Sequence, residues 1–122
     1  MYNRPMELVD ETITRQKLKK MATESFGNLV KAVVDTSKEI MVVDASLHAD
    51  EEAHLLSLGS KQSDLWGINI YPELQGDDFI EFDSMINLRP NAGNMTRSVD
   101  SENIRKKIQE IVSKLVKQDV NP

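Results

Sequence analysis

The side chains best suited to chemistry in this 122-residue chain are polar residues in its acidic middle. His48, Asp50 and Glu52 stand together in the run His-Ala-Asp-Glu-Glu. A histidine next to carboxylates can act as a general base with an orienting partner. The simpler alternative is that Asp50 and its neighbours cap a helix, because carboxylates stabilise the positive end of a helix dipole. The residues alone leave both interpretations open.

A metal site is the other chemistry that this run could support. Asp50 and His54 are four residues apart, so on a helix they would share one side, with His48 just outside as a third candidate ligand. The spacing matches no established zinc motif, and the chain has no cysteine to act as a thiolate ligand or nucleophile. It also lacks a Gly-rich phosphate loop. We therefore expect no metal and no cofactor.

A second set of polar residues follows two segments in which apolar and polar side chains alternate. Residues 65–71 and 79–89 have the period of two that is typical of strands. A hairpin centred on residue 75 would pair Asn69 with Glu81. Its polar face would contain Asn69, Tyr71, Glu81, Asp83, Asn87 and Arg89. Such a face is normally solvated, but Asn and Asp are poor strand formers, so a recognition surface with Arg89 as an anion clamp is the alternative.

Trp66 and Gly67 lie within the first of these two segments. Trp66 is the only tryptophan, and we expect it to anchor the core. Gly67 would face Asp83 in the hairpin. A glycine inside a strand indicates either a bulge or the close approach of another backbone.

Three segments have the periodicity of amphipathic helices, which need a sheet to lie on. The first has Thr14 as its N-cap, since a threonine hydroxyl can accept a hydrogen bond from the first turn. The second opens at Asp50 and ends at Gly59. The last is capped by Asp100 and carries an apolar stripe at spacings of three and four residues.

Short apolar runs rich in β-branched residues predict the remaining strands. Residues 6–9 form a short strand, and residues 29–34 and 40–45 are typical of a hairpin. Because residues 40–43 are apolar on both faces, their strand is expected at the centre of the sheet. The order of elements is then β-α-β-β-α-β-β-α. We predict an α+β fold with a mainly antiparallel sheet of four or five strands, and the first and last helices packed on one face.

Length and hydropathy limit the architecture further. The chain is long enough for one hydrophobic core, so residues 1–122 are expected to form a single domain with frayed ends at 1–5 and 119–122. The longest apolar run, residues 40–43, is far below the roughly 20 residues that a membrane span needs, and the first residues lack the apolar region of a signal peptide. We expect a cytoplasmic protein with no membrane partner.

The charge of the chain is unevenly distributed, which bears on its partners. The net charge is −5, and residues 35–100 carry thirteen acidic against four basic side chains. This balance argues against nucleic-acid binding, whose affinity comes largely from neutralising phosphates. Excess carboxylates keep a small domain dispersed, and the alternative is an acidic face that recognises a basic partner. A short first strand also leaves a sheet edge that a second copy could cover, so a homo-oligomer is a further hypothesis.

Four motifs follow one another along the chain: His-Ala-Asp-x-Glu from His48, Gly-Ser-x-Gln from Gly59, Leu-Trp-Gly from Leu65 and Ile-Asn-Leu-Arg-Pro from Ile86. Together they resemble a bacterial family catalogued only as a domain of unknown function, over about residues 29–116. Leu88 stands where that family often has isoleucine. The resemblance implies no activity, cofactor or partner. It implies a set of polar candidates: His48, Asp50, Glu52, Gln62, Asn87 and Arg89.

The leading functional hypothesis is a non-catalytic module that binds a small ligand or a protein, because the polar residues form no complete catalytic constellation. Its site is expected near His48, Asp50, Asn87 and Arg89. The full set of candidate binding residues is His48, Asp50, Glu52, Gln62, Asn69, Glu81, Asn87 and Arg89.

Two alternatives remain. One is a small hydrolase, with or without a metal, in which His48 is the base and Asp50 or Glu52 orients it or binds the metal. It requires these side chains to lie within hydrogen-bond reach of one another in a cleft. The minor alternative is a regulatory component of the toxin–antitoxin type, which rests only on size and on the kind of family.

Overall fold

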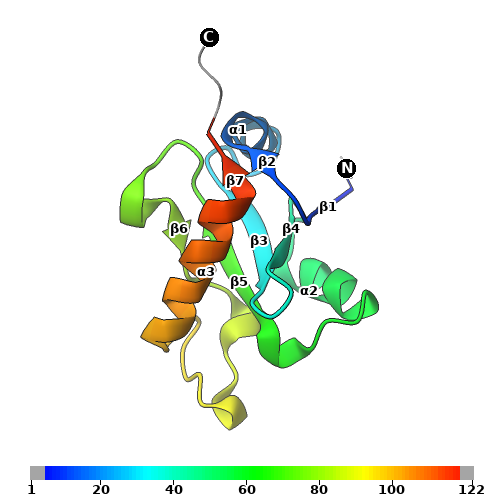
Figure 1. The fold of residues 1–122 in the computed structure, drawn as a ribbon, viewed down its shortest axis with the longest axis vertical. Coiled ribbons are helices and arrows are strands. Elements are labelled where there is room, and N and C mark those ends of the chain that lie inside the picture. Colours follow the sequence, from blue (N-terminus) through cyan, green and yellow to red (C-terminus); the bar gives the residue numbers. More distant parts are fainter. Residues whose placement is uncertain (1–4, 119–122) are drawn as a thin grey trace.

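A five-stranded antiparallel sheet forms the centre of the computed structural model, which describes residues 5–118 (Figure 1). Its strands, in spatial order, are β1 (Glu7–Val9), β4 (Ile40–Val43), β3 (Val30–Asp35), β5 (Leu65–Ile70) and β6 (Ile80–Glu81). A second, two-stranded parallel pair joins β2 (Ile13–Thr14) to β7 (Val116–Lys117) near the two ends of the described chain. The predicted α+β class with a mainly antiparallel sheet is confirmed.

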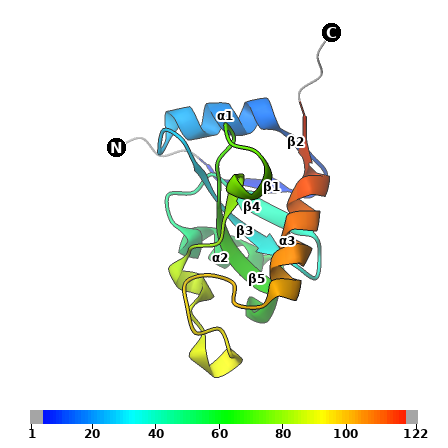
Figure 2. The same ribbon diagram turned by 90° about the vertical axis from the view of Figure 1, so that its left-hand side faces the viewer.

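Three helices pack on this sheet: α1 (Arg15–Glu24), α2 (His48–Ser57) and α3 (Glu102–Leu115). Leu18 of α1 and Ile108 of α3 are buried in one main core with the strand residue Ile68. On the opposite face, Leu55 of α2 packs with Val33 in a smaller second core. Figure 2 shows α2 and α3 on opposite sides of the strands. The prediction that the first and last helices share one face is confirmed.

The central hairpin is covered on both faces, as the apolar run predicted. In β4, Met41 and Val43 belong to the main core, whereas Val42 between them belongs to the second core. The turn of the hairpin depends on Asp35, whose Oδ1 accepts from the backbone N–H groups of Ser37 and Lys38 at 2.8 and 2.9 Å. A side chain that accepts from its own turn replaces backbone partners that the turn lacks.

The starts of the helices agree only partly with the predicted caps. Thr14 is the N-cap of α1, and its hydroxyl accepts from the Lys17 N–H group at 3.1 Å. The prediction for α2 was wrong: the helix begins at His48, so Asp50 lies inside its first turn. The prediction for α3 was wrong by one residue, because Ser101 is the N-cap and the Asp100 carboxylate instead accepts from the Met95 N–H group.

The prediction of one continuous strand over residues 79–89 was wrong. Only Ile80–Glu81 forms a strand, and a 3₁₀ helix, η3 (Met85–Asn87), follows. Ile80 and Phe82 pack against the main core, whereas Ile86 packs against the second core on the other side of the sheet. In a strand, every second side chain points to the same face, so Ile80, Phe82 and Ile86 would all share one face. Because Ile86 packs on the other face, this segment must leave the strand conformation and cross the sheet edge.

Three further 3₁₀ turns complete the secondary structure: η1 (Gln62–Asp64), η2 (Gly76–Asp78) and η4 (Pro90–Ala92). None of the helices within residues 5–118 combines the length and apolarity needed to cross a membrane. Of the ends predicted to fray, only Pro5 is described, and it is exposed. Residues 1–4 and 119–122 lie outside the described part of the chain.

Gly67 is the position where the sheet most clearly requires a glycine. A Cβ atom there would lie 2.6 Å from both the Cβ and the Oγ of Ser84. The close approach at this residue is made by the side chain of Ser84 and not by another backbone, and Ser84 belongs to the segment that crosses the sheet edge.

We predict that Gly67→Ala lowers the free energy of unfolding by about 1–3 kcal/mol, because the added methyl group must displace a packed segment. Urea denaturation measures this loss. The matched background is Ser84→Gly, which removes the atoms that clash, so the cost of Gly67→Ala should be clearly smaller there. An equal cost in both backgrounds would contradict the steric explanation.

Candidate polar binding site

Asn87 and Arg89 complete the sheet edge rather than project into solvent. The Asn87 Oδ1 accepts from the Gly67 N–H group at 2.8 Å, and its Nδ2 donates to the carbonyls of Gly67 and Arg97 at 2.9 and 3.0 Å. The carboxamide thus pairs with Gly67 as a neighbouring strand residue would. The hairpin prediction had placed Asp83 opposite Gly67; the side chain of Asn87 occupies that place instead.

Arg89 continues the same edge at the start of β5. Its Nη2 donates to the Leu65 carbonyl and its Nε to the Ile86 carbonyl, while the guanidinium lies 4.6 Å from the centre of the Trp66 ring. Burial lowers the pKa of Arg89, and the Glu52 carboxylate opposes this shift. These contacts give Arg89 a structural task that needs no bound anion. Trp66 itself is buried in the main core, as expected.

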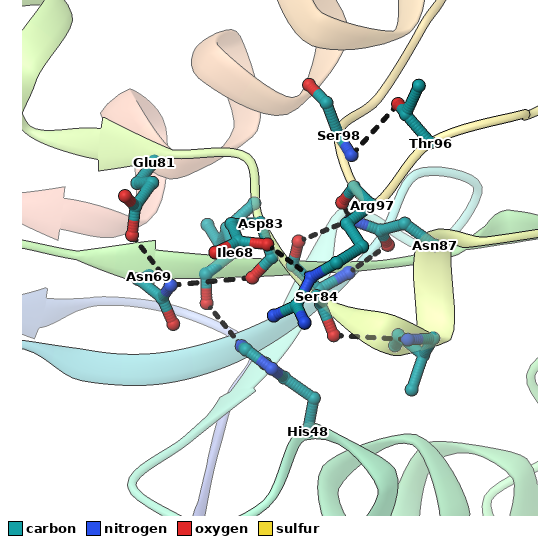
Figure 3. A network of polar contacts seen from close by, with 12 residues as sticks. His48, Ile68, Asn69, Glu81, Asp83, Ser84, Asn87, Thr96, Arg97 and Ser98 are labelled. Carbon is teal, nitrogen blue, oxygen red and sulfur yellow. Dashed lines mark hydrogen bonds and ion pairs between the residues drawn. The ribbon is translucent and has the colours of Figure 1, made fainter.

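His48 is held at the start of α2, where it points toward β5 (Figure 3). Its side chain is buried, and its Nε2 lies 2.8 Å from the Ile68 carbonyl. Because a carbonyl only accepts, Nε2 must carry the hydrogen and donate it. Burial is the main cause that lowers the pKa of His48, and the charges of Lys31 and Arg97 act in the same direction. The hydrogen bond to Ile68 and the charge of Asp83 oppose this shift without cancelling it. The fold therefore favours the neutral imidazole.

Asn69, Tyr71 and Glu81 form a hydrogen-bonded group next to His48. The Glu81 Oε1 accepts from the Asn69 Nδ2 at 2.9 Å and from the Tyr71 hydroxyl at 3.0 Å. The predicted pairing of Asn69 with Glu81 across the hairpin is confirmed. Burial is the largest cause that raises the pKa of Tyr71, and the hydrogen bond to Glu81 and the charge of Glu81 act in the same direction, so the hydroxyl keeps its proton. Asn69 is 7% exposed, and its buried Oδ1 has no hydrogen-bond partner within residues 5–118.

Asp83 and Arg97 close this side of the network. The Arg97 Nε donates to the Asp83 Oδ1 at 2.7 Å. The side chain of Arg97 is 54% exposed and that of Asp83 is 44% exposed. An ion pair this open contributes little stability, roughly 0–1 kcal/mol. We use the name polar cluster for the six side chains that these contacts and charges connect: His48, Asn69, Tyr71, Glu81, Asp83 and Arg97.

Glu51 is a fully buried acid on the same helix as His48 that sequence reasoning did not select. Its Oε2 accepts from the Ala45 N–H group at 3.0 Å, and its buried Oε1 has no partner within residues 5–118. Burial raises the pKa of Glu51 well above its usual range, which favours the neutral acid. The helical spacing of His48, Glu51 and Leu55, three and then four residues apart, was the available signal. It was missed because the predicted cap, Asp50, lies three residues after the observed N-cap, Leu47.

The structure brings together only some of the predicted site residues. Asn69 and Glu81 share a hydrogen bond, and His48 and Asn87 contact neighbouring residues of β5. Asp50 and Gln62 are exposed, and within residues 5–118 no hydrogen bond joins either to another predicted site residue. Asp83 and Arg97 belong to the polar cluster without having been among the candidate binding residues.

The geometry that the hydrolase hypothesis requires is not found. Within residues 5–118 no hydrogen bond joins His48 to Asp50 or Glu52, and the His48 Nε2 is occupied by the Ile68 carbonyl. In the same part of the chain no group of three or more His, Asp or Glu side chains is placed to hold a metal ion. Glu52 instead has a buried Oε2 without a partner among the described residues and acts electrostatically on Arg89.

Comparison with known proteins identifies the family. A family model described as protein of unknown function (DUF5674) matches residues 7–115. The chain belongs to this family. No curated protein and no solved structure matches it. The resemblance to a domain of unknown function is thus confirmed, and the structure of this DUF5674 member shows that Asn87 and Arg89 hold the sheet edge.

Asn87→Ala should lower the free energy of unfolding by about 2–4 kcal/mol, because it leaves buried backbone groups of Gly67 without partners. Asn87→Asp should be at least as damaging, since a buried carboxylate would face two carbonyl oxygens. Urea denaturation tests both. Asn91→Ala, at an exposed position of the following turn, is the control and should change stability by less than about 0.5 kcal/mol. A loss below about 1 kcal/mol for Asn87→Ala would contradict the assigned role.

Glu51→Gln should alter how stability depends on pH. Because the fold raises the pKa of Glu51, its contribution is complete below the unfolded pKa and is lost as pH rises through the folded pKa. The Glu51→Gln variant, which stays neutral at every pH, should therefore gain stability relative to the native chain between about pH 5 and pH 8, by at most about 1.4 kcal/mol per pH unit. Urea denaturation across this range checks it, with the exposed Glu110→Gln as control. A constant difference between Glu51→Gln and the native chain would refute the shift.

Proposed function

We propose that this protein is a non-catalytic binding module that recognises a positively charged segment of a protein partner at the polar cluster. The observation that carries this proposal is the state of Glu81. Its side chain is exposed, and one carboxylate oxygen is fixed by two donors, Asn69 and Tyr71. The second oxygen is thereby held in a defined direction. A carboxylate that is oriented before binding loses little conformational entropy when a ligand arrives.

The charges around Glu81 support a cationic partner. Asp83 lies two residues further along and keeps a second oxygen beyond its bond to Arg97. Residues 35–100, which supply every member of the polar cluster, carry thirteen acidic against four basic side chains. Carboxylates accept hydrogen bonds from lysine and arginine side chains, and their bonds to charged donors are stronger than neutral ones. A partner with one or two basic side chains would match this surface.

The hydrogen bond and the burial of His48 favour a binding function over hydrolysis. A general base must reach the proton that it removes, whereas the Nε2 of His48 donates to the Ile68 carbonyl and its pKa is lowered by burial. We assign His48 a positioning role: it fixes the start of α2 against β5. The more open acidic members of the cluster, Glu81 and Asp83, are then the contact residues, and Arg97 holds one oxygen of Asp83.

A hexa-arginine peptide added to ¹⁵N-labelled protein at low salt tests this proposal, with hexa-glutamate as the charge control. Hexa-arginine should shift the backbone resonances of residues 69–71, 81–83 and 97. Glu81→Gln should weaken binding about five- to tenfold, which corresponds to roughly 1–1.4 kcal/mol for a lost charge-assisted bond.

The matched control is Glu110→Gln, which removes the same charge from an exposed position of α3 on the other face of the sheet. Equal weakening by both variants would show a general charge attraction and contradict the assigned surface. Shifts confined to other residues would do the same. Because surface electrostatics is screened by salt, the comparison is made at one ionic strength.

A further inference from the structure

A cavity on the face of the sheet opposite α2 is not part of the polar cluster. It has a volume of about 260 Å³ and is lined by residues of the β5–β6 connection and of α3. Phe79, Ile80, Val112 and Val116 supply apolar walls. A cavity of this size can hold a small molecule.

Arg15 gives this cavity a fixed positive charge. Its Nη1 donates to the carbonyls of Pro72 and Leu74 at 2.7 and 3.1 Å, and its guanidinium lies 4.4 Å from the centre of the Phe79 ring. These contacts hold the hairpin connection in place, which is a structural role in itself. They also immobilise the guanidinium at the cavity wall, and within residues 5–118 no hydrogen bond occupies its Nη2.

The other polar groups around the cavity include three side chains that can donate hydrogen bonds, those of Gln109, Ser113 and Gln118. The Gln118 Oε1 accepts from the Arg15 Nε at 3.0 Å, which leaves the amide N–H groups of Gln118 as its remaining capacity. The Gln109 amide and the Ser113 hydroxyl can also donate from α3. Among the described residues that line the cavity, Asp77 is the one carboxylate, and it stands on the exposed turn η2.

We infer that this cavity is a binding site for a small organic carboxylate with a short apolar body. The carboxylate group would lie against Arg15 and Gln118, where a fixed cation and amide donors meet. The apolar body would cover Ile80, Val112 and Val116. Among residues 5–118, Nε of Arg15 donates to Gln118 and Nη1 donates to Pro72 and Leu74, so the N–H groups of Nη2 are left to donate charge-assisted hydrogen bonds to the carboxylate. Apolar walls add the favourable burial of the ligand's hydrocarbon surface. This site is independent of the proposed recognition of a cationic partner.

Sodium hexanoate is the probe, added to the full ¹⁵N-labelled chain, with hexylamine and hexan-1-ol as matched compounds of opposite and no charge. Hexanoate should cause saturable shifts at residues 76–80 and 109–116, with a dissociation constant of about 1 mM, as expected for a ligand of roughly eight heavy atoms. Hexylamine should cause none at these residues, and hexan-1-ol should bind at least about fivefold more weakly than hexanoate. The absence of saturable hexanoate shifts, or equal shifts with hexylamine, would overturn the inference.

Two variants locate the binding. Ser113→Trp fills the cavity from an exposed helix position and should weaken hexanoate binding at least about tenfold, whereas Glu110→Trp on the same helix should leave it unchanged. Arg15→Gln should weaken hexanoate binding at least about fivefold. Because that substitution also removes the hydrogen bonds to Pro72 and Leu74 in the hairpin connection, Ser113→Trp is the deciding variant. Unchanged binding in Ser113→Trp would exclude this cavity. None of these outcomes bears on the hexa-arginine experiment, which reports on different residues.

Discussion

The outer edge of β5 is the constraint on which the rest of the structure depends. Its partner β6 pairs with only Asn69 and Ile70, so the remaining outward backbone groups of the strand need other partners. Asn87 supplies them for Gly67, and Arg89 supplies one for Leu65. Side chains thus finish a ladder that the backbone leaves incomplete. This solution ties residues 83–97 across the edge of the sheet, and it fixes where Asp83 and Arg97 can stand.

The same constraint separates two kinds of polar residue that look alike in the sequence. Asn87 and Arg89 use their hydrogen-bonding capacity on the backbone, so they have little left for a ligand. Glu81 and Asp83 each give one oxygen to neighbours in the fold and keep another. In this family member, the asparagine and arginine of the Ile-Asn-Leu-Arg-Pro motif therefore complete the sheet edge. The acidic residues before the motif, Glu81 and Asp83, face outward.

Local patterns were enough to predict much of the fold. The β3–β4 hairpin, the Thr14 cap and the shared face of α1 and α3 follow from β-branched runs, a capping side chain and helical periodicity, each of which acts over a few residues. Residues 79–89 failed because alternation cannot show a change of face: Ile80 and Ile86 belong to different cores. For the site, Asn69 and Glu81 were predictable from the hairpin register. Glu51 was not predictable, because its position depends on a helix start without a capping side chain. Arg97 was not predictable, because its position depends on the segment that crosses the sheet edge.

The β6 strand also connects the two proposed binding surfaces. Successive residues of a strand point to opposite faces, so Ile80 contributes to the cavity beside α3 while Glu81 contributes to the polar cluster beside α2. The two surfaces differ in chemistry, since one has oriented carboxylate acceptors and the other has a fixed guanidinium. Both surfaces depend on the two-residue strand β6, whose backbone pairs with β5. A change that breaks this pairing would damage both surfaces together, so only side-chain substitutions at exposed positions can separate their functions.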